Sequence, residues 1–315
     1  MHKENYFIEG AVILNFDKGF YPVNYEAGFR MDGYYVWCGS CIKGDDGRYY
    51  LFASRWPKET GFPGGYKVAS EIVLASTDSL NNPFKFEKVI FSARDGGYWD
   101  GQMSHNPQVH KIDGGYLLFY IGSSDGNAEN RKIGVAYSKS IKDGWIRPEK
   151  PIDLPQNANN PSAIIDNNGS VLLAFRDGSL KVSIAKAESY DSEYEVIAYD
   201  IFPRGRIEDM FLFKNEGRYE IIAEDNEGSY TGSLGAGVHF CSDDCITWRT
   251  CEPMTVYTRS VAYNDRGEIE LQRRERPQIF LDGEDAYLFT SAKINGETRS
   301  AGGDTWSMVA RFKTK

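Results

Sequence analysis

Residues 105–121 read HNPQVHKIDGGYLLFYI, and this stretch contains the pattern that decides the fold. Polar residues and a proline open it, an apolar alternation follows, and the dipeptide Asp113-Gly114 separates that run from a second apolar and aromatic run. Asp-Gly and Asn-Gly dipeptides are typical of tight β-hairpins because both residues accept positive φ at little cost. The stretch therefore predicts two antiparallel strands joined by a short turn.

The same pattern recurs along the chain, which makes it a repeat and not an isolated hairpin. The other copies are CGSCIKGDDGRYYLFAS at 38–54, NNPSAIIDNNGSVLLAF at 159–175, IEDMFLFKNEGRYEIIA at 207–223 and RERPQIFLDGEDAYLFT at 274–290. Aligning the copies on Ser40, Pro107, Pro161, Met210 and Pro277 gives spacings of 49 to 67 residues. Five such units occupy the whole chain of 315 residues.

Most units continue with an apolar strand, a charged turn and a strand that carries an aromatic residue, as in residues 71–91, EIVLASTDSLNNPFKFEKVIF. Four antiparallel strands per unit define the blade of a propeller. We therefore predict an all-β, five-bladed β-propeller that forms a single domain over residues 1–315. The fifth unit is one strand short, and the N-terminal FIEGAVIL could supply that strand and close the ring. The alternative is a β-sandwich with irregular hairpins.

Composition excludes several classes of partner. The net charge of −9, without a run of Lys and Arg, argues against nucleic acid. No apolar run approaches the length of a membrane span, and the first ten residues, MHKENYFIEG, lack the apolar segment of a secretory signal. These features predict no membrane association and a cytoplasmic location, or a secreted or periplasmic one if a leader has been removed from the chain.

The five cysteines are odd in number and fall in two clusters, which predicts reduced thiols and no disulfide framework. Pairs such as Cys38 and Cys41 have tolerable zinc-ligand spacing, but they lie within strand patterns that send neighbouring side chains to different faces. We therefore predict no metal site from the cysteines.

Chemistry is expected at the propeller axis. The innermost strand of each blade starts at the central channel, so polar residues at equivalent starts converge there. A ring of buried polar side chains is costly unless the groups are paired or bind a ligand. The positions that we expect to meet are Cys38, Gly39, His105, Asn106, Asn159, Asn160, Glu208, Asp209, Arg274, Glu275 and Arg276.

Glycosidic cleavage needs two carboxyl groups that flank the scissile bond. We predict Glu208 as the acid, with Glu275 or Asp100 as the opposing carboxylate, while Asp209 is expected to point away from Glu208 and to orient an arginine. A plain salt bridge is the alternative for each of them, above all for Glu275 between Arg274 and Arg276.

Aromatic and basic residues near the strand ends complete the predicted substrate site. Trp37, Arg55 and Trp56 belong to the first unit, and aromatic faces commonly stack on sugar rings, although packing between blades would explain both tryptophans equally well. The pairs Arg176-Asp177 and Glu224-Asp225 end the second strands of their units, where we expect the opposite mouth of the channel. We therefore rank these two pairs below the starts of the inner strands.

The repeat and the strand starts resemble the five-bladed propeller glycosidases of glycoside hydrolase families 43, 32 and 117 over nearly the whole chain. The resemblance implies that Glu208, two residues before the proline-like Met210, is the general acid. The chain differs from this family at two places, because Gly39-Ser40 and Asn160 stand where the family has aspartates. A second carboxylate at Asp100, Glu275 or Asp32 would then replace the missing base.

Three functions follow as expectations. The first is an exo-acting glycoside hydrolase that removes a terminal sugar from an oligosaccharide or glycoside. The second is a propeller that binds carbohydrate without cleaving it. The third is a phosphate-dependent glycoside phosphorylase, in which Arg274 and Arg276 would hold the phosphate. No cofactor is required by any of them, although the resemblance allows a structural calcium ion in the channel.

Overall fold

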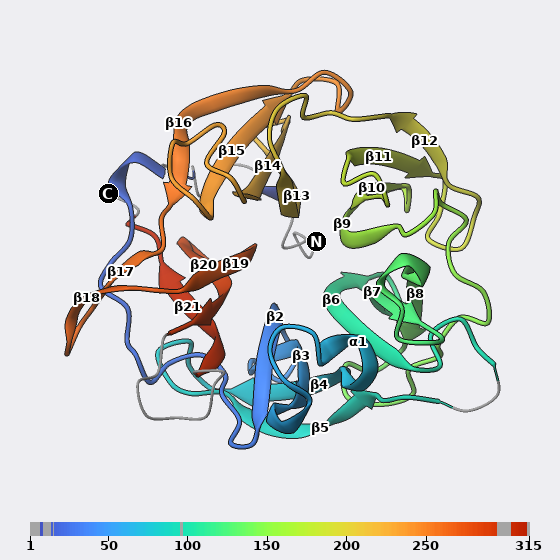
Figure 1. Cartoon of the computed structure of the whole chain (residues 1–315), viewed down its shortest axis with the longest axis horizontal. Coiled ribbons are helices and arrows are strands. Elements are labelled where there is room, and N and C mark those ends of the chain that lie inside the picture. Colours follow the sequence, from blue (N-terminus) through green and yellow to red (C-terminus); the bar gives the residue numbers. More distant parts are fainter. Residues whose placement is uncertain (1–6, 9–13, 15, 95–96, 295–303, 314–315) are drawn as a thin grey trace.

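The computed structural model describes residues 7–8, 14, 16–94, 97–294 and 304–313. Its sheets surround a common centre, with one strand of each blade nearest the axis (Figure 1). These inner strands are β2 (Tyr34–Lys43), β6 (Met103–Ile112), β9 (Asn159–Ile165), β13 (Ile207–Asn215) and β19 (Arg273–Asp282). The predicted five-bladed β-propeller is therefore confirmed, and the sandwich alternative is excluded.

Each inner strand pairs with the next strand through the turn that the repeat predicted. The second strands are β3 (Tyr49–Pro57), β7 (Gly115–Ser123), β10 (Val171–Arg176), β14 (Arg218–Asp225) and β20 (Asp285–Lys293), all antiparallel to their partners. The turn glycines Gly47, Gly114, Gly169, Gly217 and Gly283 all have positive φ, between 63° and 87°. A residue with a Cβ would be strained at these five positions.

The outer strands differ between blades. Blades one, three and four are completed by β4 (Glu71–Thr77) with β5 (Lys85–Phe91), by β11 (Val182–Ala187) with β12 (Glu195–Ala198), and by β15 (Ala236–Ser242) with β16 (Arg249–Tyr257). Within the described residues, blades two and five have one further strand each, β8 (Lys132–Ser138) and β21 (Thr305–Arg311). In blade two the fourth position is reduced to a bridge between Tyr137 and Ile146.

The segment at the edge of the fifth blade lies further along the sequence than the predicted FIEGAVIL. The backbone of residues 19–29 runs along the outer edge of β21, through bridges from Phe20 to Phe312 and from Phe29 to Ser307. The only described part of FIEGAVIL before residue 14 is β1 (Phe7–Ile8), which pairs in parallel with β13 in blade four. Residues 9–13 of that segment lie outside the described residues. A hairpin, β17 (Ser260–Tyr263) with β18 (Gly267–Glu270), adjoins the fifth blade.

The hydrophobic core lies between the blades. Each sheet is apolar on both faces, so β3, β7 and β10 are buried almost along their whole length. Five main clusters fill the five interfaces; for example, Phe119 and Leu117 of blade two pack with Leu173 and Ala163 of blade three. Equivalent clusters occupy the other four interfaces. This packing holds the five inner strands in fixed positions around the axis.

Helices are minor. Apart from three-residue 3-10 turns, such as η2 (Lys58–Thr60) and η3 (Ala128–Asn130), the described residues contain one four-residue helix, α1 (Tyr66–Ala69), beside the channel. No helix in the described part of the chain has the length and apolar character needed to span a membrane.

The cysteines do not behave as predicted. Cys241 and Cys251 form a disulfide that joins β15 and β16, the two outer strands of blade four. They are ten residues apart in sequence, but the antiparallel register places their Cα atoms 5.8 Å apart. Cys38, Cys41 and Cys245 are free and buried. The prediction of reduced thiols throughout was wrong, and the cysteines no longer argue for a reducing compartment.

Candidate active site

All five inner strands begin with the same local distortion. One residue in each has positive φ, between 53° and 58°, and the pairing register shifts at or beside it. These residues are Cys38, Asn106, Asn160, Asp209 and Arg276. Such a bulge adds a residue to one strand and interrupts the alternation of side chains. Non-glycine residues in this conformation are strained and concentrate at functional sites.

The bulge explains a wrong expectation about neighbouring residues. Simple alternation predicts that Asp209 points away from Glu208, yet both line one axial cavity. His105 with Asn106 and Glu275 with Arg276 also line it as adjacent pairs. The bulge further corrects the alignment of the first repeat, because Gly39, not Ser40, occupies the place of the prolines.

The five strained residues form a polar chain around the axis. The Cys38 thiol donates to Asn106 Oδ1 at 2.7 Å, and Asn106 Nδ2 donates to Asn160 Oδ1 at 2.9 Å. Asn160 Nδ2 and Arg276 Nη1 both donate to Asp209 Oδ1, at 2.8 and 3.2 Å. Asp209 therefore orients an arginine, as predicted, and the chain satisfies polar groups that would otherwise be costly to bury.

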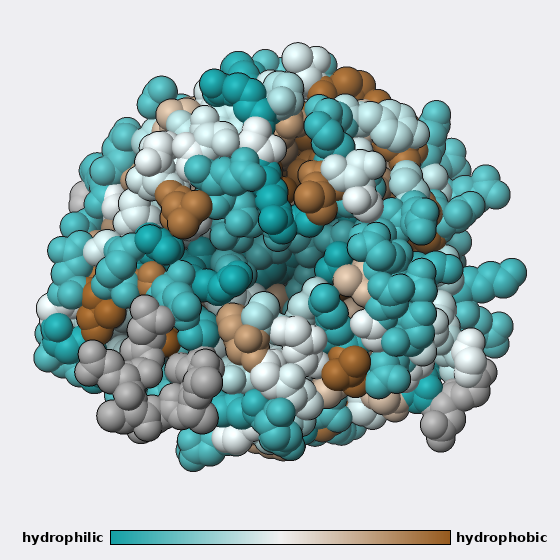
Figure 2. Space-filling model, in the orientation of Figure 1, coloured by the Kyte–Doolittle hydropathy of each residue, from teal (hydrophilic) through white to brown (hydrophobic). Residues whose placement is uncertain are grey.

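Above this chain lies a cavity of about 300 Å³. The space-filling view shows that hydrophilic residues surround the central hollow (Figure 2). One wall is aromatic, with Trp37, Trp56, Phe62 and Tyr66, and the Tyr66 ring stacks on His105 with centroids 4.7 Å apart. Burial lowers the pKa of His105 well below its ordinary value, so the imidazole is neutral and is not a proton donor at neutral pH.

Glu208 projects into the cavity from the start of β13 with two guanidinium partners. Arg176 forms an ion pair with Glu208 Oε1, and Arg206 donates through Nε to the same oxygen at 2.6 Å. The Glu208 side chain keeps 18% of its surface accessible. Two guanidiniums therefore flank one carboxylate oxygen and fix the orientation of the Glu208 side chain in the cavity.

Glu275, on the fifth blade, has the opposite surroundings. Burial and the charge of Asp209 raise its pKa to about 7, against the opposing influence of Arg273, which donates to Glu275 Oε1 at 2.7 Å. Its side chain still keeps 12% of its surface accessible and lines the cavity. A carboxyl group that carries a proton near neutral pH and reaches a ligand cavity fits a general acid.

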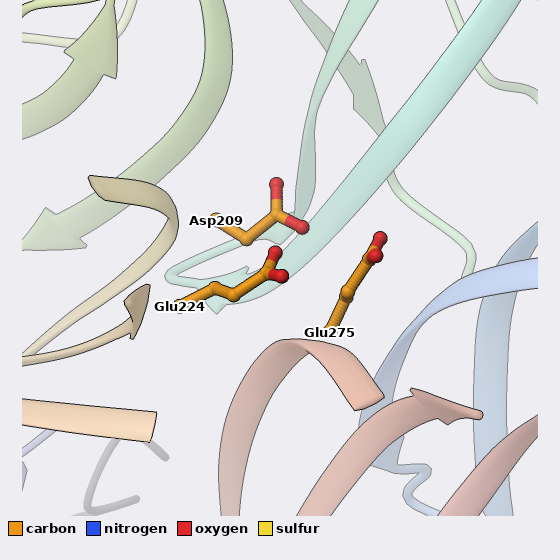
Figure 3. A group of neighbouring side chains, drawn as sticks. All are labelled: Asp209, Glu224 and Glu275. Carbon is orange, nitrogen blue, oxygen red and sulfur yellow. The ribbon is translucent and has the colours of Figure 1, made fainter. Parts of the chain in front are cut away.

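Glu275 belongs to a group of three carboxyl groups. Carboxylate oxygens of Asp209, Glu224 and Glu275 lie within 4.8 Å of one another, and the side chains extend toward a common space (Figure 3). Burial and the neighbouring Glu275 raise the pKa of Glu224 well above its ordinary value, and burial also raises that of Asp209. The cluster therefore shares protons, since three adjacent charges would repel one another.

The sequence resemblance allows a calcium ion in the channel, and these three carboxyl groups are the candidate ligands. Asp209 and Glu275 already accept hydrogen bonds from Arg276 and Arg273. A calcium ion takes six to eight oxygen ligands, whereas this cluster offers three carboxyl groups, two of which are already paired with guanidiniums. The donor set does not fit a calcium ion.

Most of the predicted site residues do meet. Those that line the cavity are Trp37, Trp56, His105, Asn106, Asn159, Asn160, Glu208, Asp209, Glu275 and Arg276. The predicted residues that do not line it are Cys38, Gly39, Asp100, Arg55, Arg274 and Asp32. Arg55 pairs with Glu71 and lies over the Tyr34 ring, and Arg274 is buried over the Tyr257 ring and donates to the Thr258 carbonyl. We therefore assign Arg55 and Arg274 structural roles.

Asp100 is a buried structural carboxylate. It is fully inaccessible, with Arg94 and Arg147 as ion-pair partners and a hydrogen bond from the Tyr120 hydroxyl at 2.7 Å. These partners tie the segment before β6 to the rest of blade two. A side chain enclosed in this way cannot reach a substrate in the cavity, so the predicted catalytic role of Asp100 is not supported.

Removing the charge at Asp100 should therefore affect stability more than catalysis. We expect Asp100→Asn to lower the free energy of unfolding by about 3–5 kcal/mol, because two half-buried guanidiniums lose a fully buried counter-charge. Asp78→Asn is the control, since Asp78 pairs with Arg48 at an exposed position and its loss should cost about 1 kcal/mol or less. Urea unfolding followed by tryptophan fluorescence measures both, and equal effects would contradict this view of Asp100.

Sequence reasoning missed several residues of the cavity. Arg131, Arg206, Arg273, Phe62 and Tyr66 come from loops and strand ends that no repeat position marks. Arg176, which lines the cavity, and Glu224, which belongs to the neighbouring carboxyl cluster, were ranked low as ends of second strands. An antiparallel hairpin brings the end of the second strand beside the start of the first. Glu208 pairs with Glu224 in this register, and Asn159 pairs with Arg176. Counting back across each hairpin would have found both.

Solved structures share the fold of this chain, and its sequence matches known proteins over part of its length. No protein-family model matches the chain. A probable arabinan endo-1,5-alpha-L-arabinosidase C from Aspergillus clavatus is 32% identical over 124 residues, which cover 39% of this chain and about a third (34%) of that protein's length. Among solved structures, one described as a glycoside hydrolase has a TM-score of 0.71 at 14% identity and covers 95% of this chain and 94% of its own.

A second solved structure, of a thermostable family-43 glycoside hydrolase, has a TM-score of 0.65 at 12% identity, over 94% of this chain and 93% of its own. The protein thus has the five-bladed fold of the propeller glycosidases, and the predicted resemblance to them is confirmed. Within that fold, the sequence match is to arabinan-degrading enzymes at low identity.

Proposed function

We propose that the protein is a glycoside hydrolase whose two working carboxyl groups are Glu275 and Glu208. The observation that carries the proposal is that both line one axial cavity in contrasting electrostatic surroundings. Glu275 has a pKa raised to about 7, whereas Glu208 lies between two arginines. Glycosidic cleavage requires two carboxyl groups in one site, one of which carries a proton that it can donate.

In this mechanism, Glu275 protonates the glycosidic oxygen and Glu208, held by Arg176 and Arg206, acts at the anomeric carbon directly or through a water molecule. These roles are the reverse of those that the family resemblance implied. The reason is electrostatic, because an acid needs to hold its proton and the pKa of Glu275 is raised to about 7. Burial and the negative charge of Asp209 keep Glu275 protonated.

We further propose that the enzyme acts on chain ends. The cavity of about 300 Å³ is at the small end for a ligand pocket, and four members of the polar chain, Asn106, Asn160, Asp209 and Arg276, line it. An aromatic wall formed by Trp56, Phe62 and Tyr66 offers a surface on which a terminal sugar ring can stack. The phosphorylase alternative loses its support, because Arg274 lies outside the cavity and Arg276 is paired with Asp209.

A panel of aryl glycosides and oligosaccharides tests the proposal, with linear arabinan included because the curated relative is named as an arabinan-degrading enzyme. We expect release of single sugars, no dependence on phosphate, and rates that are unchanged by EDTA. Products of intermediate length would contradict exo action. Loss of activity in EDTA that calcium restores would assign the three carboxyl groups to a metal, and sugar binding without any turnover would leave a carbohydrate-binding propeller.

A further inference from the structure

The cavity is rich in positive charge although the chain as a whole is acidic. Five arginines line it, Arg131, Arg176, Arg206, Arg273 and Arg276, against three carboxyl groups, Glu208, Asp209 and Glu275. The whole chain carries a net charge of −9. Such a local reversal of sign does not follow from composition and focuses an attractive field on anions in the cavity.

The carboxyl groups do not balance these arginines. Arg176 and Arg206 share one carboxylate oxygen of Glu208, so one counter-charge serves two guanidiniums. Arg276 is paired with Asp209, and Arg273 is paired with Glu275, whose pKa of about 7 leaves it partly neutral near neutral pH. His105 contributes no charge because burial keeps it neutral. A net positive charge therefore remains in the cavity at neutral pH.

Arg131 is the lining arginine that has no carboxylate partner among the described residues. It follows the short turn η3, between β7 and β8, and its guanidinium is oriented by neutral acceptors. Nε donates to the Ala128 carbonyl at 2.8 Å and to Asn157 Oδ1 at 3.1 Å, and Nη1 donates to the Tyr66 hydroxyl at 3.0 Å. These bonds hold the side chain in place and leave its charge uncompensated.

We propose that the sugar bound in this cavity carries a carboxylate, as a uronic acid does, and that Arg131 recognises it. A planar guanidinium fixed in orientation suits a carboxylate better than it suits a neutral hydroxyl group. Tyr66, the member of the aromatic wall that contacts Arg131, stacks on His105. These two rings would then support the face of the same sugar. This inference rests on the proposed glycosidase function, because it identifies the substrate class of the same site.

Binding is measured first, so that the result does not depend on turnover. Calorimetry with the Glu275→Gln variant compares glucuronate and galacturonate with glucose and galactose. We expect the acids to bind at least tenfold more tightly, and Arg131→Gln in the same background to remove the preference. Lys132→Gln is the control, because Lys132 is the exposed neighbour of Arg131 and does not line this cavity. Its preference for the acids should be unchanged.

Turnover is measured second, with matched p-nitrophenyl uronides and neutral glycosides. We expect kcat/KM to favour the uronides, and Arg131→Gln to reduce it at least tenfold more for uronides than for neutral glycosides, mainly through KM. Equal binding of acids and neutral sugars, or a preference that survives Arg131→Gln, overturns the inference. Binding of inorganic phosphate in competition with both kinds of sugar would also overturn it, because the arginines would then serve phosphate. Acids that bind without any glycoside being cleaved would instead overturn only the hydrolase proposal.

Discussion

Glu208→Gln is expected to reduce kcat about a thousandfold or more on any glycoside that the enzyme cleaves. The amide is nearly isosteric, but it cannot carry the negative charge that Arg176 and Arg206 surround. It is neither a nucleophile nor a base, so the anomeric carbon loses its partner. Because the lost charge acts on the reacting atoms and not on the rest of the sugar, we expect KM to change much less than kcat.

Two comparisons make this result specific. The loss should be similar for good and poor leaving groups, since Glu208 is not proposed to protonate the leaving oxygen. Glu188→Gln is a matched control, because Glu188 is exposed and remote from the cavity lining, and its kcat should stay within about twofold of the original. An unchanged kcat in Glu208→Gln would remove Glu208 from the mechanism.

Glu275→Gln should show a loss that depends on the leaving group. Poor leaving groups need a proton, so we expect a fall of about 10²- to 10⁴-fold in kcat for alkyl glycosides and oligosaccharides. Dinitrophenolate leaves as a stable anion without a proton. The variant should therefore cleave a dinitrophenyl glycoside with a much smaller loss of kcat. If Glu208 were the acid, as the resemblance implied, this dependence would appear in Glu208→Gln instead. The exposed turn residue Glu284 supplies the control, Glu284→Gln.

The pH profile gives an independent test of the same group. A general acid works while protonated, and the pKa of Glu275 is about 7, so kcat/KM should fall as the pH rises above about 7. Glu275→Gln should lose this alkaline limb. The folded-state pKa also lies above the ordinary value of 4.5, so folding binds a proton here: the stabilisation is complete below about pH 4.5 and is lost as the pH rises through about 7. A limb that persists in the variant would assign it to another group.

Much of the architecture follows from local sequence. The turn dipeptides mark where positive φ is needed, and the five glycines have it. The closing segment was misplaced, however. FIEGAVIL was the predicted closing strand, but among the described residues it is 19–29 that are found along β21. Edge pairing selects among such segments by geometry, because backbone hydrogen bonds do not depend on side chains.

The candidate site, too, was predicted only in part from the sequence. Glu208, Asp209, His105, Asn106, Asn160, Glu275 and Arg276 were found from their place in the repeat. Asp100 was a wrong candidate because its burial depends in part on Arg147, which lies 47 residues away in sequence. Arg131 and Arg206 have no repeat position at all, and they enter the cavity only because loops from different blades meet above it.

The sequence by itself determined the five-fold repeat, its hairpin turns and the polar character of the inner strand starts, since these depend on residue types at short spacing. Only the tertiary structure decided which carboxyl groups face one another, which arginines neutralise them, and that Cys241 and Cys251 are joined. The physical reason is that charge and proton affinity are set by neighbours in space, and at the axis those neighbours come from five separate parts of the chain.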